Sequence, residues 1–506
     1  MAFVHSSSLP ERVADVIVVG AGNAALCAAI AAREAGASVL VLEKAEEGER
    51  GGNTFYTGGG YRFPYEGLKD IRRIIPDLTD EEVERIDVGS YPASKFKDDL
   101  VRVTEGRADE SMVDYLITNA YPTVQWMSRV AGQRWVLMYG RQAYEVDGKL
   151  RFWGGMITEG VGGGEGISES LFSQLPKHGI GVRYGTGGRD LLQDETGRIV
   201  GVRVFDSTGF HDLGAGAVVL GCGGFEANQE MRTRYLGAGW EVAKVRGTRH
   251  NTGEMLRAAL EAGAQSYGHW SGAHAVAWDM MAPPTGNRRI GDLYQKHSYP
   301  LGVIVNARGE RFVDEGADLR NYTYAKYGRE ILKQPYAVAF QIFDQQTVHR
   351  LRDEYRIKEA TKAEAMTLPE LADQLGIDIG GFVRTIEAYN AACGEGDYDP
   401  SKLDGVSTRG IDPPKSNWAL PLSQPPYVGY AVTCGITFTF GGVRIQADSA
   451  QVLDTVDTPM PGLYACGEIV GGLFWHNYPG GTGLMAGAVF GRTAGAAAAR
   501  AVAAGK

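Results

Sequence analysis

The chain has 506 residues and a formal net charge of -10, which excludes nucleic acid and an anionic membrane surface as expected partners. Its length favours two domains. The five cysteines are widely spaced and form no CxxC or Cys/His pattern, so we expect reduced thiols and no protein-bound metal. Because the sequence shows neither an export signal nor a membrane-spanning apolar window, it predicts a cytoplasmic protein without a transmembrane segment.

The most informative motif lies near the start of the chain. An apolar run at 16–19 predicts a buried parallel strand, followed by a turn at Gly20 and Gly22 and an alanine-rich helix at about 23–34. Gly20 permits the tight turn, and Gly22 lets a pyrophosphate approach the backbone at the helix N-terminus. Glu43 ends the next predicted strand, where a carboxylate can bind ribose hydroxyls. This spacing predicts a dinucleotide-binding unit.

Further elements follow in chain order. The stretch 70–131 has a charged helical pattern that ends in an amphipathic helix at 112–129. The glycine cluster 160–166 predicts an exposed turn, and a helix is expected at 169–177. A strand is predicted at 181–184. These segments are interpreted as scaffold.

The glycine-rich loop 48–60 carries a family resemblance. With its Gly51-Gly-Asn53-Thr54 sequence, the chain resembles the fumarate reductase/succinate dehydrogenase flavoprotein family, which lays the isoalloxazine of FAD against this segment. Some members carry a histidine here that bonds covalently to the flavin. Asn53 and Thr54 stand in this chain instead, so the resemblance implies FAD that is bound non-covalently.

Other segments carry the same resemblance. The stretch 217–228 is similar to the family's VVLATGGF strand, and Asn251-Thr-Gly253 follows it. The stretches 441–445, 461–472 and 478–487 resemble the family's C-terminal block. The resemblance implies an α/β fold, with a Rossmann-like FAD-binding domain of the glutathione-reductase type and an inserted α+β capping domain. The implied domains are 1–265 (FAD-binding, first part), 266–440 (substrate capping) and 441–506 (FAD-binding, second part).

The motif and the resemblance together predict a set of cofactor-binding residues. They are Gly20, Gly22, Asn23, Ala24, Glu43, Lys44, Arg50, Gly51, Gly52, Asn53, Thr54, Gly58, Gly59, Gly60, Cys222, Gly223, Gly224, Asn251, Gly253, Gly467, Glu468, Thr482, Gly483 and Leu484.

The chemistry implied by the resemblance is hydride transfer between flavin N5 and a carbon of the substrate, with a proton moved at the neighbouring carbon. The run from Arg311 to Tyr322 is similar to the family's RFVNE segment, and Arg320 stands near the position of its catalytic arginine, one residue further along. Tyr478, His274 and Tyr322 are the other candidates for catalysis.

Two departures from the family pattern affect the expected substrate. Where fumarate reductases have a histidine before Gly441-Gly442, this chain has Thr437 to Phe440, and where they have an arginine before the final glycine pair it has Tyr478-Pro479. The motifs are most similar to the tricarballylate dehydrogenase branch, which oxidises a tricarboxylate and passes electrons to a separate protein. A tyrosine before Pro-Gly is also similar to 3-ketosteroid dehydrogenases. A flavin-bearing electron-transfer subunit is the third alternative.

Overall fold

The strand-turn-helix-strand unit forms as the sequence predicts. β1 (Arg12–Val19) is followed by α1 (Asn23–Glu34) and β2 (Val39–Leu42), and β1 and β2 pair in parallel. The side chains of Val16, Ile17 and Val18 are fully buried, because β1 lies inside a sheet that is covered on its faces. The computed structural model describes residues 10–505, so the first residues of the chain, where no export signal is found, lie outside the described range.

β1 lies in an eight-stranded mixed sheet. Its order is β10-β11-β12-β1-β2-β9, with β20 beside β12 and β19 beside β20. β1, β2, β9, β20 and the last part of β12 run parallel, so their carboxyl ends meet at one edge, where ligands of open α/β sheets bind. The remaining bounds are β9 (Gly181–Arg183), β10 (Gly187–Gln193), β11 (Ile199–Asp206), β12 (Gly209–Leu220), β19 (Gln451–Leu453) and β20 (Pro459–Ala465).

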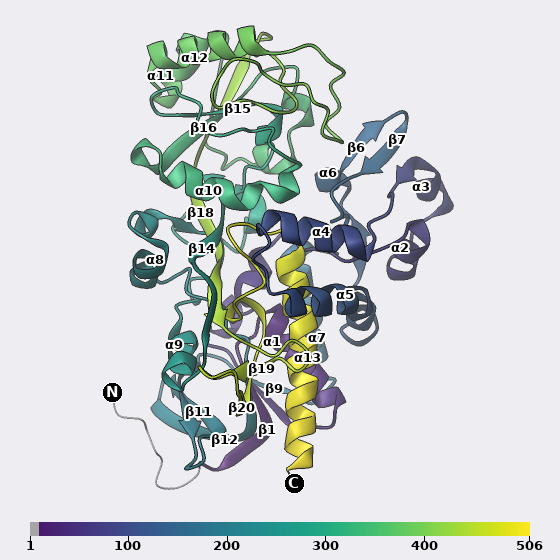
Figure 1. Ribbon diagram of the computed structural model, residues 1–506, viewed down its shortest axis with the longest axis vertical. Coiled ribbons are helices and arrows are strands. Elements are labelled where there is room, and N and C mark those ends of the chain that lie inside the picture. The colour runs from purple at the N-terminus through teal and green to yellow at the C-terminus, as the bar shows by residue number, and fades with distance from the viewer. Residues whose placement is uncertain (1–9, 506) are drawn as a thin grey trace.

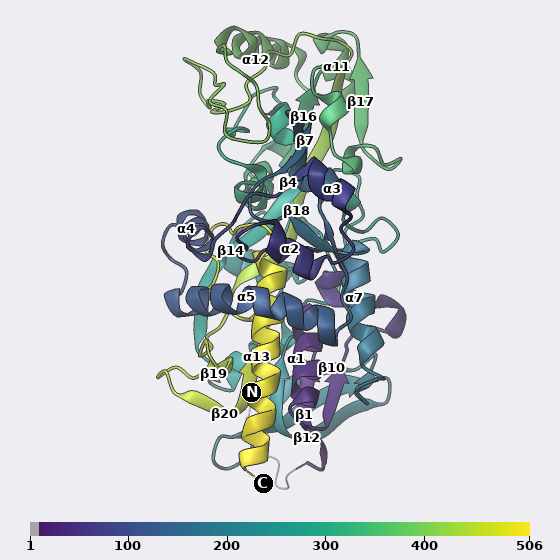
Figure 2. The same cartoon turned by 90° about the vertical axis from the view of Figure 1, so that its right-hand side faces the viewer.

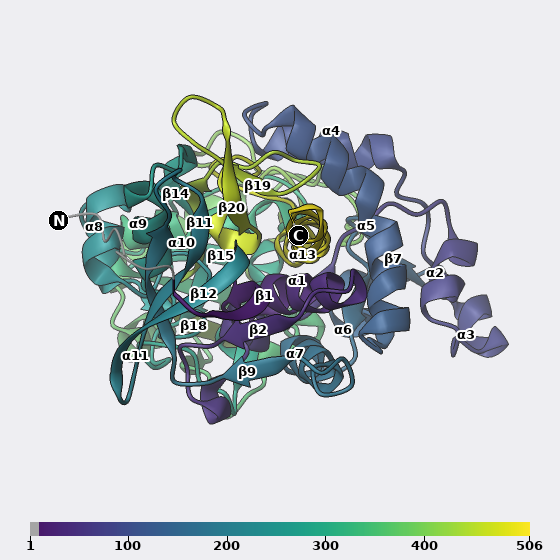
Figure 3. The same cartoon turned by 90° about the horizontal axis from the view of Figure 1, so that it is seen from below.

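The C-terminal helix packs on the first helix of the chain. α13 (Thr482–Ala504) runs alongside α1, and Figure 3 shows α13 nearly end-on next to α1 and β1. A Cβ atom at Gly491 would lie 2.3 Å from the backbone oxygen of Ala24, and one at Gly495 would lie 1.9 Å from that of Ala28. Glycine at this spacing therefore lets the two helix backbones touch and brings the last segment of the chain to the nucleotide unit.

A second sheet has six strands and lies toward the other end of the molecule (Figure 1). The long antiparallel pair β14 and β18 extends from this end toward the first sheet (Figures 1 and 2). The predicted domain boundaries at 265/266 and 440/441 fall on these two strands and stay a prediction. The bounds are β13 (Lys244–Val245), β14 (Ser266–Asp279), β15 (Val303–Asn306), β16 (Val338–Phe343), β17 (Lys362–Ala365), β18 (Tyr427–Val443), α10 (Tyr324–Leu332), α11 (Leu368–Leu375) and α12 (Ile379–Ala392).

The stretch 70–131, between β2 and β9 of the first sheet, is largely helical, as predicted, and its amphipathic helix spans Glu110–Val130. Two three-stranded sheets, β3-β8-β5 and β4-β7-β6, accompany these helices. The bounds are β3 (Gly60–Tyr61), α2 (Leu68–Ile74), α3 (Asp80–Arg85), β4 (Ile86–Asp87), α4 (Ala93–Val103), α5 (Glu110–Val130), β5 (Trp135–Leu137), α6 (Tyr139–Gln142), β6 (Ala143–Val146), β7 (Lys149–Phe152), β8 (Thr158–Gly160), α7 (Gly163–Gln174), α8 (Gln229–Leu236) and α9 (Glu254–Glu261).

The prediction of an exposed turn over the whole of 160–166 was wrong. α7 begins at Gly163, inside the glycine cluster, and ends at Gln174. A Cβ atom at Gly164 would lie 2.1 Å from the backbone oxygen of Thr54. The glycines therefore serve close packing of the helix start against the 3₁₀ turn Gly52–Tyr56, a contact that local sequence patterns do not reveal.

Within residues 10–505, no helix is long and apolar enough to cross a membrane. The cytoplasmic location stays a prediction.

Candidate active site

A cavity of about 270 Å³ extends from the carboxyl edge of the first sheet to the second sheet. Gly20, Gly22 and Glu43 line its nucleotide end, whereas Arg320 and Tyr478 line its other end. The cavity therefore joins the predicted cofactor unit to the predicted catalytic residues.

The start of α1 is shaped for a phosphate group. Gly22 stands before the helix without a capping side chain, so amide groups of the first turn remain available to an anion. A Cβ atom at Gly22 would approach no atom closer than 3.5 Å, which leaves open space beside the backbone. The Asn23 amide donates to Thr54 Oγ1 at 2.9 Å, and its side chain donates to Leu484 O at 2.9 Å. Three distant segments thus meet around this helix start.

Glu43 is buried at the end of β2 and lines the cavity. Its Oε1 accepts a hydrogen bond from the Ala45 amide at 2.8 Å. Burial raises the pKa of Glu43, and the bond from Ala45 opposes this effect. The side chain stands where the sequence predicts the ribose acceptor, beside Lys44, whose Nζ pairs with Glu254 at 2.7 Å.

Replacing Glu43 tests the ribose assignment. We expect Glu43→Ala to weaken FAD binding by about 1 to 3 kcal/mol, because two ribose hydroxyls would lose a charged acceptor. The measurement is titration of the apoprotein with FAD. The matched control is Glu46→Ala, since Glu46 is an exposed carboxylate nearby that does not line the cavity. Equal affinity for FAD in the two variants would remove Glu43 from the binding site.

The loop that resembles the isoalloxazine-binding segment is held by its asparagine. Asn53 Nδ2 donates to Glu226 Oε1 at 2.6 Å and to Thr437 O at 2.7 Å, and Asn53 Oδ1 accepts from the Thr248 amide at 2.8 Å. Thr54 is likewise used, as the acceptor for Asn23. Both side chains are therefore engaged in holding the loop, and non-covalent binding of the flavin stays a prediction.

We therefore expect the flavin to leave the protein when it is precipitated with acid. A non-covalent cofactor is released when the fold is lost, so the yellow colour should appear in the supernatant. The absorbance of both fractions at about 450 nm measures this, with free FAD as the reference. Colour that remains on the washed, denatured protein would show a covalent bond.

Two carboxyl groups are buried together beside this loop. Asn251 Nδ2 lies 2.6 Å from Glu226 Oε1 and 3.4 Å from Glu468 Oε2, and Glu468 Oε1 accepts from the Thr439 amide at 2.8 Å. Burial raises the pKa of both Glu226 and Glu468, and their mutual repulsion adds to the effect for Glu468. These shifts favour a state in which at least one of the two carboxyl groups is protonated. Sequence reasoning missed Glu226, although it directly follows the Cys222-Gly-Gly-Phe segment.

Arg320 lies at the far end of the cavity in an unusual environment. Only 7% of the residue is exposed, and its guanidinium makes no hydrogen bond or ion pair within the described part of the chain. It lies against the rings of Trp153 and Tyr324, 5.6 and 5.4 Å from their centroids. Burial and the nearby Arg352 lower the pKa of Arg320 to about 9. A buried, unpaired cation of this kind calls for an anionic ligand.

Tyr478 and His274 stand beside Arg320 in the same cavity. The hydroxyl of Tyr478 lies 2.5 Å from that of Tyr324, so one hydroxyl donates to the other. The ring of His274 packs 4.8 Å from that of Tyr478, and neither ring nitrogen has a partner among residues 10–505. Burial and the Arg246 charge lower the pKa of His274 well below 6.5, so His274 is neutral at physiological pH. Tyr324, which also lines the cavity, is not among the predicted catalytic residues.

Four predicted site residues do not line the cavity. Arg50 pairs with Glu169 at 2.9 Å on the surface. Gly51 packs against Ser168, Thr482 is fully buried at the start of α13, and the hydroxyl of Tyr322 donates to Asp99 at 2.7 Å in a separate polar cluster. The hydroxyl of Tyr322 is used by that cluster, so its predicted role in catalysis has no support from the cavity and stays a prediction.

The other predicted residues come together around the cavity. They are Gly20, Gly22, Asn23, Ala24, Glu43, Lys44, Gly52, Asn53, Thr54, Gly58, Gly59, Gly60, Cys222, Gly223, Gly224, Asn251, Gly253, Gly467, Glu468, Gly483, Leu484, His274, Arg320 and Tyr478. Their roles in binding and catalysis stay predictions.

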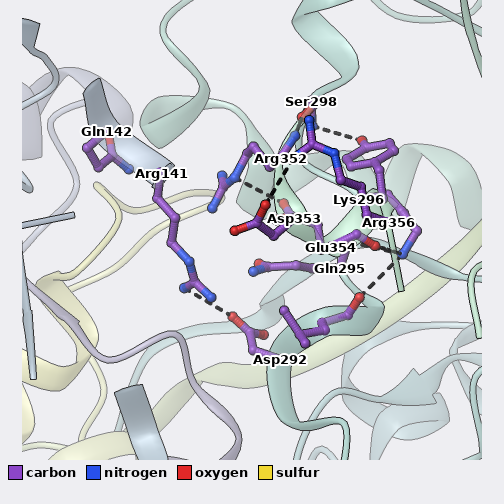
Figure 4. Close-up of polar contacts among 12 residues, drawn as sticks. Arg141, Gln142, Asp292, Gln295, Lys296, Ser298, Arg352, Asp353, Glu354 and Arg356 are labelled. Carbon is purple, nitrogen blue, oxygen red and sulfur yellow. Dashed lines mark hydrogen bonds and ion pairs between the residues drawn. The ribbon is translucent and has the colours of Figure 1, made fainter. Parts of the chain in front are cut away.

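Sequence reasoning missed three arginines that line the same cavity, Arg141, Arg246 and Arg352. Arg246 is neutralised by Asp292, whose Oδ1 lies 2.6 Å from its Nη2, and it donates to Thr437 Oγ1 at 3.1 Å. Arg141 lies 3.8 Å from the other oxygen of Asp292 (Figure 4). No local motif marks these arginines, because they come from separate segments.

The cavity fits FAD. It offers an uncapped helix start for the pyrophosphate, a buried carboxylate at the ribose position and a glycine-lined wall where backbone can approach a flat ring. The cofactor expected from the sequence is therefore consistent with the residues present.

Comparisons with known proteins agree. The family model described as "FAD binding domain" matches residues 15–484. The urocanate reductase of Eggerthella lenta is 29% identical over 96% of this chain and 74% of its own length. The open conformation of a flavocytochrome c3 fumarate reductase superposes with a TM-score of 0.72 at 26% identity, covering 97% of this chain and 79% of the other.

A 3-ketosteroid Δ1-dehydrogenase from Sterolibacterium denitrificans also has a TM-score of 0.72, at 22% identity, and covers 97% of this chain and 100% of its own, which shows a shared fold. The chain belongs to the FAD binding domain family, within the fumarate reductase flavoprotein group, and is an FAD-dependent oxidoreductase that acts on CH–CH bonds.

Proposed function

We propose that the protein dehydrogenates a small polycarboxylate such as tricarballylate to the corresponding alkene, or catalyses the reverse reduction. The observation that carries the proposal is the buried guanidinium of Arg320, which has no partner in the described residues and lines the cavity. A carboxylate is the anion that its planar fork binds with two parallel hydrogen bonds. Arg141 and Arg352 add positive charge to the same end.

Arg320 is also the proposed acid/base. FAD, when bound, supplies the acceptor for the hydride. For dehydrogenation, Arg320 in its unprotonated form takes up the proton from the neighbouring carbon and becomes the guanidinium, and the lowering of its pKa to about 9 increases the fraction of that form. The neutral rings of His274 and His297 add no competing charge, because burial lowers the pKa of each well below 6.5.

A panel of substrates under anaerobic conditions tests the proposal. We expect tricarballylate to bleach the flavin absorbance within the enzyme's turnover time, whereas succinate and a 3-ketosteroid leave it largely oxidised. An enzyme already reduced with dithionite should be reoxidised by the unsaturated tricarboxylate. Bleaching by the steroid alone would overturn the proposal.

A second candidate is the desaturation of a ketone, as in 3-ketosteroid dehydrogenases. The hydroxyl pair of Tyr324 and Tyr478 favours it, because such a pair can donate to a carbonyl oxygen. Phe438 and Phe474 pack against Tyr478, with ring centroids 5.2 and 5.3 Å away, and give the cavity an apolar wall. The unpaired Arg320 argues against it, since a steroid would leave that charge without a partner.

We further propose that the electrons pass to a separate acceptor protein. The support is the resemblance to flavoproteins that work with such partners. If the enzyme turns over its substrate without an acceptor protein and never passes electrons to an electron carrier, this proposal fails. The third alternative, a flavin-bearing electron-transfer subunit, would then fail as well.

A further inference from the structure

A second, smaller cavity of about 30 Å³ adjoins the main one. The two cavities share four side chains, Arg141, His297, Arg320 and Arg352. Aromatic and apolar residues such as Trp153 and Trp418 form much of the remaining wall. Three guanidinium groups therefore stand at the boundary between the two cavities.

The guanidinium of Arg141 has no hydrogen bond within residues 10–505. Its nearest carboxylates are Asp292 at 3.8 Å and Glu159 at 4.0 Å, and the first is already bound to Arg246 at 2.6 Å. Burial raises the pKa of Glu159, which reduces the negative charge that this carboxyl offers. Donors of Arg141 therefore remain free to bind an anion in the cavity.

The guanidinium of Arg352 also has donors that make no hydrogen bond in the described residues. Its Nε lies 3.1 Å from Glu354 Oε1 in an ion pair without hydrogen-bond geometry, and its Nη1 is buried without a partner in the described residues. Only 9% of the side chain is exposed. A buried donor left without an acceptor destabilises the fold, so a bound anion would remove this cost.

The two arginines come from different segments of the chain, and each segment is held by its own contacts. Arg141 lies on α6, and its guanidinium packs over Gly58, where a Cβ atom would lie 1.8 Å from Nη1. The Arg352 amide donates to Ser298 Oγ at 3.2 Å, and Lys296 Nζ donates to the neighbouring Glu354 O at 3.0 Å. Figure 4 shows the two side chains reaching from these two segments into the same region.

We propose that Arg141 and Arg352 form a subsite for a carboxylate of the substrate that is remote from the reacting carbons. This inference rests on the proposed function. It accounts for the missing cations at Thr437–Phe440 and Tyr478-Pro479, because this chain supplies positive charge from other segments. Arg320 holds the carboxylate beside the reacting carbons, and the Arg141/Arg352 subsite selects substrates that carry a further carboxylate.

Binding of two non-reacting probes to the FAD-loaded enzyme tests the subsite. Citrate carries three carboxylates, whereas succinate carries only two, on adjacent carbons, and lacks the remote one; calorimetry or the change in flavin absorbance gives each dissociation constant. We expect Arg141→Gln and Arg352→Gln to weaken citrate binding by about 10- to 100-fold, the effect of losing a hydrogen bond to a charged group. Succinate binding should change by less than about threefold.

Arg289→Gln is the matched control. Arg289 lies in the same part of the fold, is 75% exposed and pairs with Glu359 at 2.9 Å, so its loss should change neither dissociation constant. Arg141→Lys and Arg352→Lys serve if a glutamine variant fails to fold or to retain FAD. The lysine variants keep the charge but lose the planar fork, and we expect intermediate citrate affinity.

The outcomes separate the subsite from the proposed reaction. Equal losses for citrate and succinate, or no loss for either, would overturn the subsite even if tricarballylate bleaches the flavin. Selective loss of citrate binding would support the subsite, including in the case that no polycarboxylate reduces the flavin and the proposed reaction therefore fails.

Discussion

Arg320→Lys is expected to bind FAD normally and to undergo flavin reduction by the true substrate at least about 10²-fold more slowly. Lysine keeps the positive charge but loses the planar fork, and its shorter reach displaces the group that accepts the proton. Arg320 also has no other duty in the described residues, since its guanidinium makes no hydrogen bond there. Stopped-flow absorbance measures the rate constant, and FAD content measures cofactor binding.

The dependence of the rate constant for flavin reduction on pH provides a second test of Arg320 as the base. Because burial lowers the pKa of Arg320 to about 9, the unprotonated form that accepts the proton increases as the pH rises toward 9. The rate constant for dehydrogenation by the wild-type enzyme should therefore rise from pH 7, reach about half of its maximum near pH 9 and level off above that pH. A rate in Arg320→Lys equal to that of the wild type would assign the proton to Tyr324 or Tyr478 instead.

Gly20→Ala is expected to yield protein without flavin and with a lower melting temperature. Gly20 has a φ of +102°, which costs a residue with a side chain about 1 to 3 kcal/mol. In addition, its Cβ atom would lie 2.4 Å from Gly221 O, so β1 and β12 would have to separate where the cofactor binds. FAD content after gel filtration and thermal unfolding measure the effect.

Gly36→Ala separates these two contributions. Gly36 has a similar φ of +91°, but a Cβ atom there would meet no atom within 4 Å. We expect this variant to lose some stability and to keep its flavin. Comparable loss of flavin in both variants would mean that backbone strain alone explains the effect at Gly20, and that close contact with Gly221 does not matter.

The sequence predicted the nucleotide unit nearly to the residue, because that signal is local. The buried strand 16–19, the helix 23–34 and Glu43 follow one another along the chain, and each conformation depends on neighbours in sequence. The glycine cluster 160–166 was harder to interpret, since a glycine can serve a turn or a close packing contact. The distant loop that α7 contacts decides between them.

The family resemblance identified Arg320 and Tyr478 from segments far apart in sequence, and both line the cavity. It also brought in Tyr322, which lies only two residues from Arg320. The short 3₁₀ turn Arg320–Tyr322 directs these two side chains to different places, so that Tyr322 reaches Asp99 while Arg320 reaches the cavity. At a helix end, two residues that are close in sequence can therefore place their side chains in different surroundings.

The sequence by itself determined the FAD-binding unit and the flavoprotein family, and it predicts that the cofactor is bound non-covalently. Only the tertiary structure decided which cations reach the substrate end. Arg141, Arg246 and Arg352 lie on separate segments with no shared motif, and they meet because the long pair β14 and β18 and the short helix α6 place those segments around one cavity. The position of a guanidinium depends on such long-range packing, which no local pattern of residues encodes.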